Sequence, residues 1–339
     1  MIRHFAALLV LYSHHYALLK QPEPIFLNWD TYGTLAVLLF FSISGYFMPI
    51  SFICAGNFVR YMIKRIRRIF PGLTVCMFCM YYLIGSLFVS SSALSYLLSP
   101  NTLVTTLTHI LSMHGPKIPG VFTDFLYPEA INGSLWTLPI EFIYYIMLGL
   151  LLSLSTHWRT IAYLVAGFIL LHFISRNTWI NQLYYANKFH LYYLTLFGLA
   201  FSGGALLSAL QKYWLVYKNY LLILSVTSLL FFSYLPCVLK VINLTLLTIT
   251  FALTIPDSLI KRKFDISYGI YIYAFPIQQI TINLITADFI KGMLLAIFFT
   301  ILAGFFSYYF VEKPFLKPKI KKNNERMKKL IVRPHTFST

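Results

Sequence analysis

Residues 135–154 read LWTLPIEFIYYIMLGLLLSL, a run in which Glu141 is the only charged side chain. A helix rises about 1.5 Å per residue, so about 20 mostly apolar residues cross the hydrocarbon core of a bilayer. Backbone amides and carbonyls find no water inside lipid, which leaves the α-helix as the economical structure for such a run. The stretch therefore predicts a membrane-spanning helix that carries one carboxylate.

The rest of the chain has the same character. Of its 339 residues, 58% are hydrophobic and 11% are charged, and the mean hydropathy is +0.72. A soluble protein carries about 25% charged residues. We therefore predict an all-α, polytopic transmembrane bundle of about ten helices, with a re-entrant hairpin at 217–255 as the local alternative. The predicted spans lie near residues 2–19, 33–53, 70–93, 135–154, 159–175, 190–210, 217–235, 238–255, 268–287 and 292–311.

Basic residues orient these predicted helices. If 54–69 is cytoplasmic, alternating spans also place 1–3, 155–159, 211–218, 256–267 and 312–339 in the cytoplasm. Those segments hold 21 of the 27 Lys and Arg residues, which leaves six for the opposite side. This asymmetry is the positive-inside pattern. We predict that both termini are cytoplasmic, that residues 1–311 form the transmembrane domain, and that residues 312–339 form a basic cytoplasmic tail.

The net charge of +17 is accounted for by this topology and does not indicate nucleic-acid binding. Cys76 and Cys79 form a lone Cys-x-x-Cys, and no second pair completes a zinc site. In an apolar span such thiols are predicted to pack as small hydrophobic side chains. No metal site and no permanently bound cofactor are predicted.

Two polar residues share one face of the first predicted helix. Arg3 and His14 are eleven residues apart, which is three helical turns plus about 20° and about 16 Å along the axis. Ionisable groups inside a span are costly and are functional candidates by default. Arg3 is placed to hold an anionic group at the cytoplasmic rim, with His14 at a reacting centre deeper in the bundle. The alternative is a snorkelling Arg and a structural His.

Glu141 is the predicted partner of His14. It lies about two turns inside a helix whose start, Asn132 and Ser134, suits N-terminal capping. A buried carboxylate seeks a partner, and a His beside a carboxylate is a familiar general base. A purely structural His–Glu bond is the alternative.

Arg65 and Arg68 lie three residues apart in a basic segment, so they project together from a helix. Two guanidinium groups on one face suit phosphate recognition. The alternative is an ordinary charge run that sets the topology.

The chain resembles the acyltransferase-three family of integral-membrane acyltransferases over nearly its whole length. Six motifs in order carry the resemblance: Arg3 to His14, 40–47, 65–71, 132–141, 266–271 and 310–314. Leu38 stands where family members often have Asp, and Ala274 stands where many have a second His. Few residues precede the first motif, which leaves open a start upstream of Met1.

The resemblance implies a membrane O-acyltransferase of the bacterial inner membrane. Its expected reaction moves acetyl from cytoplasmic acetyl-CoA, or another acyl-CoA co-substrate, to a hydroxyl of a cell-envelope or exported polysaccharide such as O-antigen, capsule or exopolysaccharide. His14 and Glu141 would be catalytic, with a covalent acyl-His14 intermediate as a variant. The expected donor-binding residues are Arg3, Arg65 and Arg68, and the expected substrate-positioning residues are Trp136, Asn132, Ser134, Tyr268 and Glu312.

Other classes of membrane protein remain as alternatives. A transporter or flippase of a glycan or small molecule could also use an intramembrane His–Glu pair, but it often shows inverted repeats, and none is evident. A glycan polymerase should have a larger outer connection than residues 94–134. An inactive acyltransferase-like protein is a third alternative, because the expected Asp and second His are missing.

Overall fold

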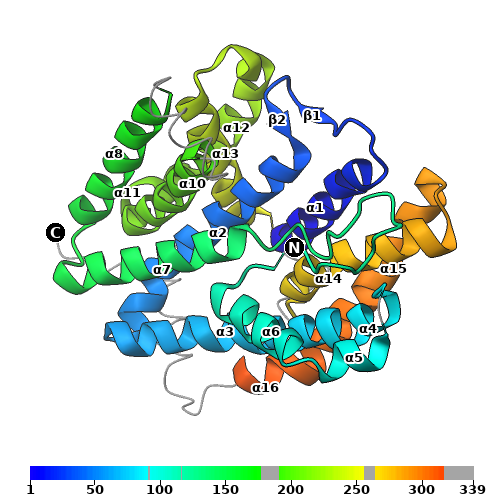
Figure 1. The fold of residues 1–339 in the computed structure, drawn as a ribbon. Helices are drawn as coiled ribbons and strands as arrows, with labels where there is room; N and C mark the ends of the chain where they lie inside the picture. Colours follow the sequence, from blue (N-terminus) through cyan, green and yellow to red (C-terminus); the bar gives the residue numbers. More distant parts are fainter. Residues whose placement is uncertain (91, 116, 177–190, 256–263, 317–339) are drawn as a thin grey trace.

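The computed structural model describes residues 1–90, 92–115, 117–176, 191–255 and 264–316, and within them the chain is mostly helical (Figure 1). The only strands there are the short pair β1 (Ile25–Phe26) and β2 (Asp30–Thr31). The long helices are α1 (Ile2–Leu18), α2 (Tyr32–Ala55), α3 (Phe58–Phe78), α6 (Pro100–Ser112), α7 (Thr137–Leu154), α8 (Trp158–Ser175), α10 (Leu191–Ala209), α12 (Lys218–Thr227), α13 (Cys237–Thr254), α14 (Ser267–Ile280) and α15 (Phe289–Phe306). Shorter pieces are η1 (Cys79–Ile84), α4 (Gly85–Phe88), α5 (Ala93–Leu98), α11 (Gln211–Trp214), η2 (Leu215–Tyr217), η3 (Ser228–Tyr234), η4 (Thr281–Ile285), η5 (Ser307–Glu312) and α16 (Lys313–Leu316).

The predicted all-α bundle is confirmed. Each of the ten predicted spans coincides with helical structure in the described ranges, and eight helical stretches there are long and apolar enough to cross a membrane. The remaining two predicted spans are α1, with 17 residues, and α14, which continues into η4. The stretch Gln211–Tyr234 is among the eight, which favours two separate spans over a re-entrant hairpin at 217–255. The predicted basic tail lies outside the described residues from position 317 onward.

One boundary differs clearly from the prediction. The basic segment 54–69 was expected to connect two spans, with the next span starting at residue 70, but α3 already begins at Phe58. The Asn57 side chain accepts a hydrogen bond from the backbone N–H of Arg60 at 2.9 Å, which caps the helix. Farther along, the Cys76 thiol is buried as predicted and donates to the carbonyl of Ile272 at 3.3 Å.

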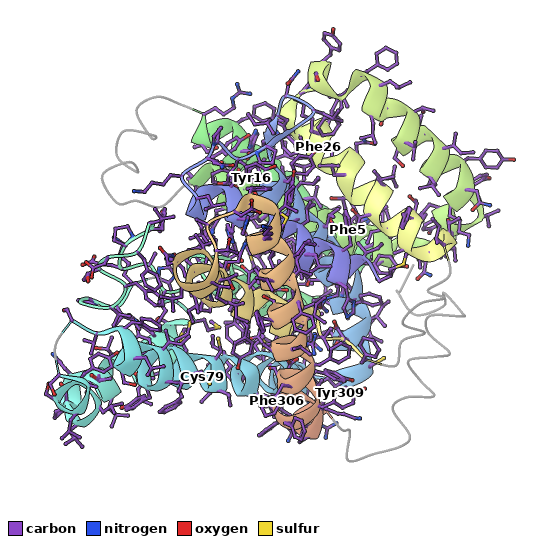
Figure 2. All side chains as sticks on the ribbon, turned by 90° about the vertical axis from the view of Figure 1, so that its right-hand side faces the viewer. Phe5, Tyr16, Phe26, Cys79, Phe306 and Tyr309 are labelled. Carbon is purple, nitrogen blue, oxygen red and sulfur yellow. The ribbon has the colours of Figure 1, made fainter. Side chains whose placement is uncertain are left out.

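The outside of the bundle is apolar. Phe5 on α1 and Phe306 on α15 are among many large hydrophobic side chains that are exposed, and both project from the bundle in Figure 2. Soluble monomers rarely expose apolar surface on this scale. A lipid environment removes the cost of that exposure, so the surface agrees with a multi-pass membrane protein.

Helix α2 runs through the middle of the bundle, between α1 and α10 (Figure 1). Among the described elements its contact with α10 is the most extensive, and two glycines lie at this contact. A Cβ atom on Gly45 would lie 1.9 Å from the carbonyl oxygen of Phe201, and one on Gly204 would lie 2.2 Å from that of Ser42. Small residues let helix backbones approach closely in membranes. The α2–α10 crossing therefore fixes α2, and with it the side chains that α2 sends toward α7 and α3.

Candidate active site

His14 lies in the interior of the bundle, about one turn before the end of α1. Its Nδ1 is 3.2 Å from the Ser134 hydroxyl oxygen, and its ring meets Phe275 edge-on at 5.5 Å between centroids. Its helix neighbours Ser13 and His15 are fully buried, whereas His14 is only partly buried. No residue that the structure describes hydrogen-bonds to its Nε2. The ring is therefore held through one nitrogen and has the other nitrogen free for a reacting group.

Ser134 is itself firmly placed. Its backbone N–H donates to Asn132 Oδ1 at 3.1 Å, and its carbonyl accepts a hydrogen bond from the Tyr271 hydroxyl. Asn132 Nδ2 also donates to the carbonyl of Ile272 at 2.8 Å, so two bonds tie the turn before α7 to α14. The Asn132 bond resembles a helix cap, but the residue directly before α7 is Trp136, which makes no capping bond with its side chain.

The predicted His14–Glu141 pair is wrong. Glu141 Oε1 accepts hydrogen bonds from Ser44 at 2.7 Å and from the Tyr145 hydroxyl, and its described contacts do not include His14. The reason is position along the chain: His14 contacts Ser134 in the turn before α7, whereas Glu141 lies seven residues later, in the second turn of α7. The orienting partner of His14 is Ser134.

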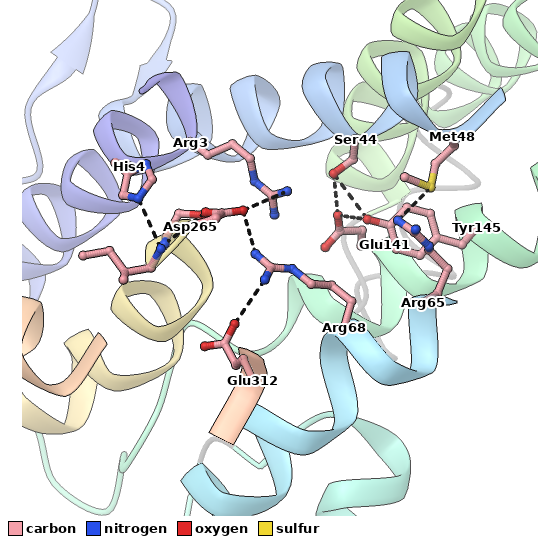
Figure 3. A network of polar contacts seen from close by, with 12 residues as sticks. Arg3, His4, Ser44, Met48, Arg65, Arg68, Glu141, Tyr145, Asp265 and Glu312 are labelled. Carbon is pink, nitrogen blue, oxygen red and sulfur yellow. Dashed lines mark hydrogen bonds and ion pairs between the residues drawn. The ribbon is translucent and has the colours of Figure 1, made fainter. Parts of the chain in front are cut away.

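Arg3 and Arg68 converge on the carboxylate of Asp265, just before α14 (Figure 3). Asp265 Oδ2 lies 2.7 Å from Arg68 Nη2 and 3.7 Å from Arg3 Nη1. Arg68 Nη1 also pairs with Glu312 at 3.2 Å. Burial alone would raise the pKa of Asp265, but the two guanidinium groups and a hydrogen bond from Ser267 outweigh it and hold that pKa below its usual range. Asp265 is therefore ionised at neutral pH.

Arg65 lies beside this cluster with a different set of contacts (Figure 3). Its guanidinium contacts Ser51 Oγ at 3.2 Å and Met48 Sδ at 3.4 Å, and it lies over the rings of Tyr61 and Tyr145. Among the described residues it has no carboxylate within ion-pair distance. Its charge is therefore available to an external anion.

The remaining predicted positioning residues divide into buried and exposed. The Tyr268 hydroxyl donates to the carbonyl of Ile69 at 2.8 Å, and Arg68 lies over the Tyr268 ring. Glu312 is fully buried and accepts a hydrogen bond from Ser307 at 3.1 Å. These two residues hold Arg68 in place. Trp136 is exposed at the start of α7, where its ring packs near Phe197.

The family-model comparison agrees with this geometry. Residues 1–312 match the family model of the acyltransferase-three domain, described as an acyltransferase domain. The chain belongs to the acyltransferase-three family. This acyltransferase is 35% identical to an O-acetyl transferase of Shigella phage Sf6 over 92% of its own chain and 93% of the relative. It is 29% identical to nodulation protein 10 of Rhizobium leguminosarum bv. viciae, over 49% of its own chain and 47% of that protein. No solved structure was found to match it.

The protein is thus a multi-pass membrane enzyme that transfers an acyl group to a hydroxyl oxygen. Its candidate site has two parts on one face of α1: an arginine cluster near Arg3 and the His14–Ser134 contact about three turns away. Sequence reasoning missed Asp265 and Tyr145. Asp265 is an acidic residue in the basic connection 256–267. Its negative charge among basic residues was the one feature of the sequence that could have identified it.

Proposed function

We propose that this enzyme transfers acetyl from cytoplasmic acetyl-CoA to a hydroxyl of a cell-envelope or exported polysaccharide, in the bacterial inner membrane. The observation that supports it best is the order of groups along α1. Cationic side chains meet at one end, and a singly held His lies about 16 Å farther in. The phage relative is named an O-acetyl transferase, which favours acetyl as the transferred group and oxygen as the acceptor atom.

The donor end of the proposed path is the arginine cluster. The nucleotide part of acetyl-CoA carries several phosphate charges, and guanidinium groups bind phosphates with paired hydrogen bonds. Arg3, Arg65 and Arg68 come from α1 and α3, in segments predicted to be cytoplasmic, where acetyl-CoA is found. Glu141 acts here as a positioning residue, because it fixes Tyr145, whose ring lies against Arg65.

The transfer step uses the free nitrogen of His14. The acceptor hydroxyl oxygen attacks the carbonyl carbon of the thioester as its proton passes to His14 Nε2. The carbon–sulfur bond breaks, an ester forms, and the proton moves on to the sulfur of the leaving CoA. To accept this proton, His14 must start as the neutral tautomer with its proton on Nδ1. That Nδ1–H donates to the Ser134 hydroxyl oxygen, which keeps Nε2 directed at the acceptor.

Mass spectrometry of envelope glycans tests the reaction as a whole. Cells with the enzyme should contain a polysaccharide heavier by one acetyl group per modified residue than matched cells without it. Purified enzyme in vesicles should move radiolabel from acetyl-CoA to that polysaccharide. Label that stays on acetyl-CoA when the extracted polysaccharide is present would contradict the proposal.

Ser134→Ala tests the orientation of His14. Loss of one neutral hydrogen bond is worth about 1 kcal/mol, so kcat should fall by about 3- to 10-fold with the KM for acetyl-CoA unchanged. Ser153→Ala is the control, because Ser153 lies near the other end of α7, the helix that follows Ser134, and its only hydrogen bond among the described residues is to the carbonyl of Gly149. Equal transfer rates in the Ser134→Ala and Ser153→Ala variants would exclude a role for Ser134 in orienting His14.

Arg65→Gln tests the donor site. Charged hydrogen bonds are worth about 1.5–3 kcal/mol, so acetyl-CoA affinity, measured by calorimetry, should fall by about 10- to 100-fold. Of the three arginines, Arg65 gives the most direct test of donor binding, because its replacement leaves no described carboxylate unpaired. Arg67→Gln is the control, since the Arg67 side chain is exposed on the same helix. An unchanged donor affinity in Arg65→Gln would exclude this site.

A further inference from the structure

Asp265 has no part in the reaction described above, yet it occupies the centre of the arginine cluster (Figure 3). A single oxygen, Oδ2, faces both Arg3 and Arg68. The other oxygen, Oδ1, accepts hydrogen bonds from Ser267, at 2.5 Å from the hydroxyl and 3.3 Å from the backbone nitrogen. An anionic oxygen between two guanidinium groups is also the arrangement in which a phosphate oxygen would bind. Asp265 therefore holds the groups that the donor needs.

The two carboxylates that bind Arg68 differ in exposure. The Glu312 side chain is 0% exposed, whereas that of Asp265 is 35% exposed. Glu312 is also fixed by Ser307, and removing its partner would leave a buried charge unpaired. Glu312 is thus a permanent support for Arg68. Asp265 is the carboxylate that an incoming anion can reach.

The contact between Arg3 and Asp265 is weaker than that between Arg68 and Asp265. At 3.7 Å the Arg3 pair is an ion pair without a hydrogen bond, and the buried Arg3 Nε has no partner among the described residues. One third of the Arg3 side chain is exposed. Arg3 therefore keeps donors that a phosphate group could satisfy better than Asp265 does.

We propose that Asp265 is an internal counter-anion that competes with the phosphates of the acyl-CoA donor for Arg3 and Arg68 and so sets the donor affinity. This inference rests on the proposed donor site. In the resting enzyme Asp265 neutralises and orients the two arginines. When the donor binds, a phosphate oxygen takes over the contacts of Oδ2, while Ser267 retains Oδ1. After transfer, the returning carboxylate helps to release CoA.

Asp265→Asn tests the competition directly. The amide keeps the shape and an oxygen for Ser267 but loses the charge. The Kd for acetyl-CoA and for free CoA, measured by calorimetry, should each fall by about 3- to 10-fold, and the gain should shrink as salt is added. In steady-state assays the KM for acetyl-CoA should fall and product inhibition by CoA should become stronger, while kcat should not rise. Tighter binding cannot result from misfolding, so the expected result is specific.

Asp288→Asn is the matched control, because Asp288 caps α15 by accepting from the backbone N–H of Lys291 at 2.8 Å, away from the arginine cluster. Its donor affinity should equal that of the wild type. Glu312→Gln should weaken donor binding, since Arg68 loses its buried support. The inference therefore predicts opposite changes in acetyl-CoA affinity: tighter binding in Asp265→Asn, because Asp265 competes with the donor, and weaker binding in Glu312→Gln, because Glu312 supports Arg68.

The outcomes separate this inference from the proposed function. If Arg65→Gln weakens donor binding but Asp265→Asn leaves it unchanged or weaker, the donor site stands and the competition is refuted. If Arg65→Gln leaves acetyl-CoA affinity unchanged, the donor site itself is refuted, whatever Asp265→Asn does. Tighter binding in Asp265→Asn together with tighter binding in Asp288→Asn would show a general charge effect and would also overturn the inference.

Discussion

Replacing His14 with Ala should lower kcat for acyl transfer by about 10²–10⁴-fold, the range that a positioned general base contributes. Donor affinity should not change, because His14 lies about 16 Å along α1 from Arg3. The fold should also persist, since the His14 side chain is partly exposed and its one hydrogen bond within the described part of the chain is to Ser134. The measurements are label transfer from acetyl-CoA in vesicles, acetyl-CoA calorimetry and thermal unfolding in detergent.

His15 is the contrasting control. It is fully buried, with Nε2 3.1 Å from the carbonyl of Phe289 and Nδ1 3.3 Å from Gln278 Nε2. His15→Ala removes both contacts and opens a cavity, so it should lower the unfolding temperature. His14→Ala should not. Wild-type transfer by a folded His14→Ala enzyme would exclude His14 as the base, whatever the other variants do.

The helices were predictable from the sequence because lipid allows few ways to pair the backbone. Long apolar runs and the distribution of Lys and Arg were sufficient to place the ten segments. The start of α3 at Phe58 was not predicted, because hydropathy cannot identify the basic first turns of a helix that carries Arg60, Arg65 and Arg68.

The members of the site were easier to predict than their partners. Periodicity placed Arg3 and His14 on one face of α1, and the structure agrees that both side chains point into the bundle. Periodicity does not say how far two helices are shifted along each other. That shift brings Ser134, and not Glu141, to His14. Asp265 was missed for a related reason: its partners are far away in sequence, and only the fold brings them together.

Gly45 explains in physical terms one of the motifs that carried the family resemblance. The motif 40–47 looks like an ordinary apolar stretch of α2 with small residues. In the structure, the Gly45 backbone lies against the Phe201 backbone of α10, and the neighbouring Ser44 holds Glu141 at 2.7 Å. The small residue therefore serves the packing of two helices, and the packing places a side chain that supports the site.

Gly45→Ala should destabilise the enzyme by about 3 kcal/mol, the upper part of the range for overpacked cores. The added Cβ would meet the Phe201 carbonyl oxygen at 1.9 Å, and a backbone atom cannot turn away as the end of a side chain can. α2 and α10 must separate instead, which loses contacts along the crossing and moves Ser44 away from Glu141. Unfolding temperature in detergent and transfer rate should therefore fall together.

Gly203→Ala is the matched control on α10, one residue from Gly204. Its Cβ would meet Thr245 Cγ2 at 3.6 Å, an ordinary contact, and Ala favours the helix over Gly by up to about 1 kcal/mol. Gly203→Ala should therefore be neutral or stabilising, whereas Gly204→Ala should resemble Gly45→Ala, because its Cβ would meet the Ser42 carbonyl oxygen at 2.2 Å. Once either substitution has separated the helices, the second costs little more, so the double variant should be less destabilised than the sum of the two. Additive losses would mean that each glycine acts independently and that the close α2–α10 crossing is not their shared cause.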